Sequence, residues 1–209
     1  NMLDDDYVAQ FAIETNADMN SLNLLPGNIG EMVIPVSAES RALDAAFTQI
    51  TDKAAEIQSR GIYGDETMIA AAAEFSTYFS DPDAVNMMLD TLANYSMGME
   101  NGVSEVDTAT MVNYATNLGK ITGGAYDAMS EKGFVFSDVQ RDIIDGTATQ
   151  AQIVAQLGAE YVDMSEDMQA AAAITQVIDE YWAGLYETMS ATPEGRIVQM
   201  LHTWGDMQE

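Results

Sequence analysis

Residues 81–98, DPDAVNMMLDTLANYSMG, decide the fold class of this chain. Asp81 is a favourable N-cap and Pro82 suits the first position of a helix. Apolar residues then recur at spacings of three and four, before Gly98: Val85, Met88, Leu89, Leu92 and Tyr95. This is the spacing of one buried helical face, so the stretch predicts an amphipathic α-helix.

The same spacing occurs upstream of this helix. One apolar stripe is formed by Leu43, Ala46, Phe47, Ile50, Ala54 and Ile57, and it stops at Gly61 and Gly64. Asp65 is a candidate N-cap for a second helix, whose apolar face holds Met68, Ala72, Phe75 and Phe79. We therefore expect two amphipathic helices before residue 81, each with its stripe buried.

Downstream, capping signals mark several shorter helices. One is expected from about Asp107 to Gly119, and another over 126–132 with Gly133 just past its end. Ser137 and Gln140 have the spacing of a capping box, in which side chain and backbone satisfy each other's donors. Thr147 and Gln150 are predicted to repeat this device before the next helix.

The last third of the chain predicts a long helix and a terminal one. The long helix is expected over 165–189, with an apolar face of Ile174, Ile178, Tyr181, Trp182, Leu185 and Met189. Thr192 and Pro193 begin the terminal helix, which holds Ile197, Met200, Leu201 and Trp204. About nine helices with short links predict a compact all-α bundle, without internal repeats or a coiled coil.

The beginning of the chain does not follow the helical pattern. Tyr7, Ala9, Phe11 and Ile13 alternate with other residues, and 32–36 is a short apolar run. One or two short strands are therefore expected between residues 7 and 36. We expect an irregular N-terminal segment over 1–36 and a helical domain over 37–209, together a fragment of a longer protein.

The charge balance excludes several classes of partner. The chain has 209 residues with 34 acidic and seven basic side chains, a net charge of −27. The basic residues are scattered singly, which disfavours binding to nucleic acid or to an anionic membrane surface. The apolar runs are too short to span a bilayer. The acidic surface is interpreted mainly as solubilising, with docking of a basic partner or of calcium as the alternatives.

No residue pattern predicts a catalytic, cofactor-binding or metal-binding site. Cysteine is absent, and His202 is the single histidine, expected in a surface or packing role. Carboxylate pairs are too common to identify an active site. The acids at 4–6, and Asp81 with Asp83, do not match a calcium-binding loop. Most of the 15 methionines are expected in the core, whereas Met97 and Met99 are expected to be exposed in a loop.

Three groups of sequence together resemble the globular segment of phage tail tape measure proteins. The first is AAEIQ at 54–58, GIYGDE at 61–66 and AAAE at 71–74. The second is YATNLGK at 114–120, GAYD at 124–127 and GFVFSDVQ at 133–140. The third is TPEGRI at 192–197 and WGD at 204–206. The likeness covers about residues 42–208, and none of its motifs is catalytic.

The resemblance implies a non-enzymatic structural module that contributes to tail assembly and tail-length determination. It implies contacts with tail tube, tail chaperone or baseplate proteins. It also implies a place in the virion tail of a phage or prophage, after synthesis in the bacterial cytoplasm. The long heptad helices and apolar spans of that family are missing here. Two alternatives remain: an acidic helical adaptor for another protein, and a carboxylate-based cell-wall hydrolase.

Overall fold

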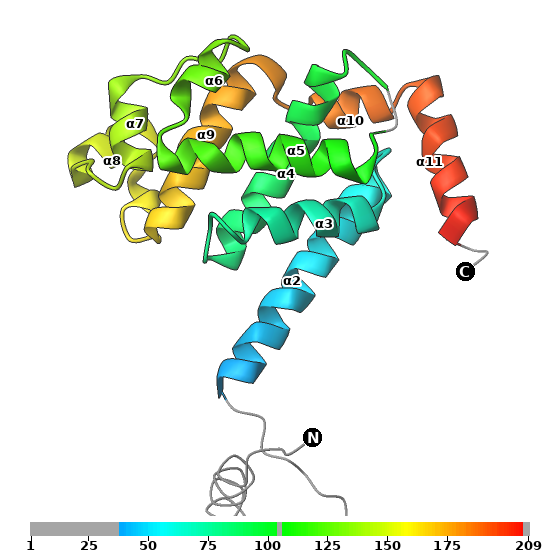
Figure 1. Ribbon diagram of the computed structural model, residues 1–209, viewed down its shortest axis with the longest axis horizontal. Helices are drawn as coiled ribbons and strands as arrows, with labels where there is room; N and C mark the ends of the chain where they lie inside the picture. The colour runs from blue at the N-terminus through cyan, green and yellow to red at the C-terminus, as the bar shows by residue number, and fades with distance from the viewer. Residues whose placement is uncertain (1–37, 104–105, 207–209) are drawn as a thin grey trace, which may run out of the picture. The chain divides into compact units, whose positions relative to one another are not determined.

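The computed structural model describes residues 38–103 and 106–206 (Figure 1). The chain divides into two units, Asn1–Ala38 and Glu39–Glu209, and the described helices belong almost entirely to the second. The strands expected between residues 7 and 36 lie outside the described residues.

The described residues form ten α-helices and two short 3-10 helices, and no strand occurs among them. The predicted all-α class is therefore confirmed. The first half comprises α2 (Ala38–Arg60), α3 (Asp65–Phe75), α4 (Pro82–Met99), α5 (Thr108–Gly119) and η1 (Lys120–Gly123). The second half comprises α6 (Tyr126–Ser130), α7 (Asp138–Ile144), α8 (Gln150–Gln156), η2 (Ala159–Tyr161), α9 (Glu166–Trp182), α10 (Leu185–Ser190) and α11 (Pro193–Asp206).

Two helix pairs organise the core: α4 packs against α9, and α3 packs against α5. All five predicted core residues of α4, from Val85 to Tyr95, are buried. The facing side of α9 is rich in alanine, and Ala171 and Ala173 are fully buried. Small side chains there allow the two helix backbones to approach closely while larger residues of α4 fill the space.

Helix starts follow local capping chemistry. The Asp81 carboxylate accepts a hydrogen bond from the Asp83 amide at 2.9 Å, and Asp107 caps α5 in the same way. The predicted capping box of Ser137 and Gln140 is confirmed at the start of α7. Asp65, in contrast, lies at the first helical position of α3, because Gly64 is the N-cap.

The second predicted capping box was placed two residues too early. It consists of Thr149 and Gln152, at the start of α8. Gly146 adopts a left-handed conformation with φ of 68°, and the amides of residues 147 and 148 both donate to the Asp142 carbonyl. These bonds close the C-terminus of α7 and delay the start of α8, which sequence spacing could not show.

The predicted helix over 165–189 is in fact two helices. The helix α9 ends at Trp182, and α10 begins at Leu185 after Gly184, whose φ of 66° is left-handed. Ala183 is extended, so the hydrogen-bond ladder cannot continue. Tyr181, which was expected on the buried apolar face of one long helix, is exposed. The Tyr181 ring makes an edge contact with Phe134.

An aromatic cluster connects α4, α5, α9 and the segment between α6 and α7. The ring of Tyr95 on α4 contacts the rings of Tyr114, Phe134 and Trp182 at centroid distances of 5.6–5.8 Å. Gly98 provides room for Trp182, because a Cβ atom at residue 98 would lie 2.2 Å from that ring.

The expectation that Met97 and Met99 are loop residues is wrong. Both belong to α4, where Met97 is fully buried and Met99 is partly buried.

Candidate functional site

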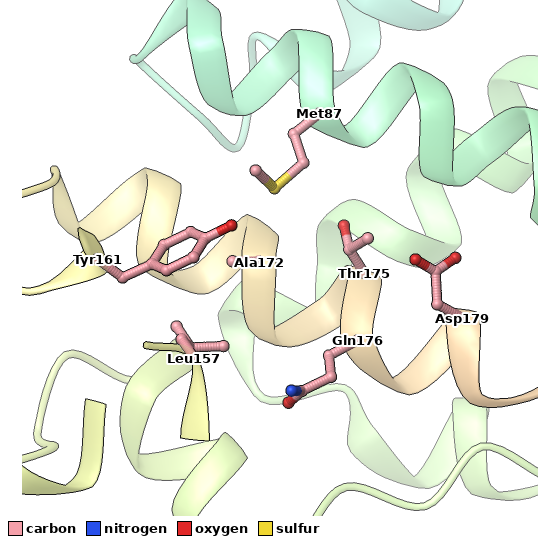
Figure 2. A pocket seen from close by; sticks show the side chains of 7 residues that line it. All are labelled: Met87, Leu157, Tyr161, Ala172, Thr175, Gln176 and Asp179. Atoms are coloured by element: carbon pink, nitrogen blue, oxygen red, sulfur yellow. The ribbon is translucent and has the colours of Figure 1, made fainter. Parts of the chain in front are cut away.

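A groove of about 280 Å³ runs along α9 (Figure 2). Ala172, Thr175 and Asp179 follow one another on α9 at helical spacing, and Met87 of α4 lies across from them. Leu157 and Tyr161 lie at the end of the groove away from Asp179. The groove is lined by Met87, Leu157, Tyr161, Ala172, Thr175, Gln176 and Asp179. It is therefore apolar at one end and acidic at the other.

Two polar side chains of the groove are committed to the fold. The hydroxyl oxygens of Thr175 and Thr91 are 2.6 Å apart and share a hydrogen bond between α9 and α4. The Gln176 amide donates to the Gln156 carbonyl at 3.0 Å and accepts from the Gln156 amide group at 2.6 Å. These bonds fix the walls of the groove and leave few polar positions for a ligand.

Asp179 is the exception. Its Oδ1 atom is buried and has no hydrogen-bond partner within the described part of the chain. Burial raises the pKa of the Asp179 carboxyl, and the nearby charge of Asp90 raises it further. An unpaired buried carboxylate oxygen is costly, because the solvation it loses is not replaced. Asp179 is therefore the one groove residue whose negative charge a cationic ligand could offset.

The neighbouring Asp90 is already paired. It accepts from Lys53 at 2.6 Å and from Arg60 at 2.8 Å, and Arg60 also binds Glu187 of α10 at 2.9 Å. Hydrogen bonding to Lys53 lowers the pKa of the exposed Glu56 carboxyl. This cluster ties α2 to α4 and α10. Two of the seven basic side chains are thus neutralised by acids of the same domain.

The first half of α2 carries an exposed apolar face. Leu43 and Phe47 are 71% and 63% exposed, although they continue the stripe of Ala54 and Ile57, which are fully buried. Figure 1 shows this half of α2 extending away from the other helices. The prediction that the whole stripe is buried is therefore wrong, because the body covers only its second half.

The terminal helix α11 has a second exposed apolar face. Ile197, Met200 and Leu201 are 60–68% exposed and lie at spacings of three and four. The opposite side is anchored, since Val198 packs against the core and the Gln199 amide donates to the Ser59 carbonyl at 2.8 Å. The helix thus holds its apolar side chains outward while its other side is fixed.

The acidic clusters considered in the sequence do not gather into a metal site in the described residues. Asp81 is a helix cap, and Asp83 accepts a hydrogen bond from Gln49. No group of three or more histidine, cysteine or acidic residues is suitably placed for a metal ion in the described ranges. The acids at 4–6 and the side chain of His202 lie outside the described residues. No helix in the described ranges is long and apolar enough to cross a membrane.

A second cavity of about 290 Å³ lies where α4 and α10 meet, lined by Met97, Gly98, Asn101, Gly102, Trp182, Leu185 and Met189. Its lining carries no titratable group, so it could select a ligand by shape but provides no acid or base. Sequence reasoning identified neither cavity, because both depend on how α4 packs against helices that are distant in sequence.

The fold and these surfaces define an acidic all-α domain with an acid-ended groove and two exposed apolar helix faces. No protein-family model, curated protein or solved structure matches the chain. The function of the domain is therefore inferred from its own chemistry.

Proposed function

We propose that the chain is a non-enzymatic structural module of a phage or prophage tail tape measure protein. In this role it acts through contacts with other tail proteins and contributes to tail assembly and tail-length determination. The observation that carries the proposal is the outward-facing apolar surface of α2 and α11, formed by Leu43, Phe47, Ile197, Met200 and Leu201.

Large apolar side chains in helical register favour burial in a protein interface. Full burial of one such side chain is worth about 2 kcal/mol, so five of them exposed on two helices represent a substantial driving force for docking. Scattered exposed apolar residues need no explanation, whereas grouped ones mark interaction surfaces. Leu43 with Phe47, and Ile197 with Met200 and Leu201, are grouped in this way.

The three sequence groups that resemble tape measure proteins include glycines with packing roles. A Cβ atom at Gly61 would overlap the Tyr186 ring, and one at Gly119 would overlap the Tyr78 ring. A Cβ atom at Gly195 would lie 2.6 Å from the Met189 carbonyl. The sequence groups that carry the resemblance therefore include glycines that the packing of this domain requires.

The partners proposed from the resemblance are tail tube, tail chaperone or baseplate proteins. Direct nucleic-acid binding by this domain is not proposed, since Lys53 and Arg60 are engaged with acids and the net charge is −27. An acidic protein in a DNA conduit would also be repelled by the DNA that follows it.

An antibody raised against residues 38–206 tests this proposal on purified tail particles from a strain that carries the gene. We expect the chain in assembled tails. Its absence from tails, with normal expression in the same cells, would contradict the proposal.

Two alternatives have one supporting observation each. The acid excess favours an adaptor for a basic partner outside any phage, and a gene neighbourhood without tail genes would support it.

The raised pKa of Asp179 is a property that a general acid in a cell-wall hydrolase would need. A peptidoglycan zymogram tests this activity, and only clearing that is lost in Asp179→Asn would support it.

A further inference from the structure

The groove along α9 has the dimensions and polarity of a site for a long side chain with a charged end. Ala172 and Asp179 are seven residues apart on one helix, which places them about 10 Å apart along its axis. Met87, Leu157 and the Tyr161 ring provide apolar contact at the end away from Asp179. This arrangement matches an aliphatic stem that ends in a polar head.

Asp179 alone determines which charge the polar end of such a side chain must carry. Thr175 and Gln176 are occupied by hydrogen bonds within the domain, so they specify no ligand charge. Among the described residues that line the groove there is no lysine or arginine. The nearest acid that affects Asp179, Asp90, already holds Lys53 and Arg60, so these cations are not available to neutralise it.

The geometry of the carboxyl group distinguishes between the two common cations. Oδ1 of Asp179 is buried, whereas the residue as a whole is partly exposed and lines the groove, so we infer that a ligand would meet Oδ2. An arginine guanidinium favours two parallel hydrogen bonds to both carboxylate oxygens. A lysine ammonium is a compact point charge that needs only one of them, on a four-carbon stem.

We propose that this groove receives a lysine side chain of a partner protein, with its stem along Met87 and Ala172 and its ammonium group against Asp179. The surplus of negative charge on the domain raises the local concentration of such cationic groups. This site is distinct from the apolar faces of α2 and α11, and it does not depend on the tape measure assignment.

The test is an NMR titration of the ¹⁵N-labelled chain with Nα-acetyl-lysine methylamide. The norleucine analogue, which has the same stem without the ammonium, is the uncharged probe, and n-pentylammonium is the free-amine probe. Asp179→Asn is compared with Glu180→Gln. Glu180 is the exposed neighbour on α9, so this control removes the same charge one residue away.

We expect saturable shifts of the amides of residues 172–179 with the lysine probe and none with the norleucine probe. Loss of one charge-assisted hydrogen bond predicts about tenfold weaker binding in Asp179→Asn, and Glu180→Gln should change the affinity less than about twofold. The spectra themselves report whether each variant is folded.

Equal weakening in both variants would overturn the proposal, because bulk charge would then explain the binding. Equal binding of the norleucine probe, or shifts spread over the surface, would also overturn it. Binding of n-pentylammonium without the lysine probe would overturn the assignment to a protein side chain. A lysine probe that does not bind would overturn the groove assignment but leave the proposed role of α2 and α11 intact. Absence of the chain from tails would leave the groove assignment intact.

Discussion

Replacing Gly61 by alanine should displace the buried ring of Tyr186. Gly61 lies between α2 and α3, and a Cβ atom there would be 2.0 Å from the Cζ atom of Tyr186. The Tyr186 ring is held firmly, since it stacks on Tyr63 at a centroid distance of 5.0 Å. Its hydroxyl donates to the Ile57 carbonyl at 3.2 Å and accepts from the Tyr63 amide at 3.1 Å.

The magnitude follows from the contacts that would be lost. Burial raises the pKa of the Tyr186 phenol to about 12, so the hydroxyl remains a donor at neutral pH. Each hydrogen bond is worth about 1 kcal/mol, and the stacked pair about 1 kcal/mol more. Alanine stiffens the unfolded chain and returns about 0.5–1 kcal/mol. The expected net loss in the free energy of unfolding is therefore about 2–2.5 kcal/mol.

Urea denaturation followed by far-ultraviolet circular dichroism measures this loss. The matched control is Gly123→Ala, because a Cβ atom at Gly123 has nothing within 4 Å. That control should be neutral or slightly stabilising. The same Gly61→Ala change in a Tyr186→Ala background should be much less costly, since the clash is gone. A loss below about 1 kcal/mol for Gly61→Ala would refute the packing of Tyr186 described above.

Three further predictions concern charge and capping. Burial raises the pKa of the Asp179 carboxyl, so its contribution to stability is present at acidic pH and is lost as pH rises through the folded-state pKa. The melting temperature of Asp179→Asn should therefore rise relative to that of the unchanged protein as the pH increases from 4 towards neutrality. A difference in melting temperature that stays constant over this range would contradict the prediction. Thr149→Ala should lower the free energy of unfolding by about 1 kcal/mol and Thr147→Ala by less than about 0.5 kcal/mol, since Thr149 caps α8. In the presence of chelator, the melting temperature should rise from low to moderate salt as the net charge of −27 is screened, and a fall would contradict the proposed self-repulsion.

Helix identity was largely predictable from the sequence because caps act locally. Asp81, Asp107 and Ser137 each accept a hydrogen bond from a backbone amide two or three residues later. The apolar face of α4 was predicted correctly for a related reason, since every residue of its stripe meets a neighbouring helix. Such signals depend on spacing within one helix, and spacing is visible in sequence.

The errors arise where tertiary packing decides the outcome. Leu43 and Ile57 share one stripe, yet the first is 71% exposed and the second is fully buried, because only the second half of α2 meets the body. The break at Gly184 was hidden by apolar residues that continue in helical register on both sides. The groove at Asp179 required α4, α9 and two residues that follow α8, Leu157 and Tyr161, to be brought together, and the isolated acid gave no signal of it.

The proposed function requires this domain to act through the apolar faces of α2 and α11. Counting assembled tails from a strain in which the gene carries Leu43→Ser and Phe47→Ser tests it most directly, with Val135→Ser as control. Val135 is 66% exposed but lies outside both faces. We expect far fewer tails of normal length with the double variant and an unchanged number with the control, at equal levels of folded protein. Equal numbers of normal tails for both would contradict the claim.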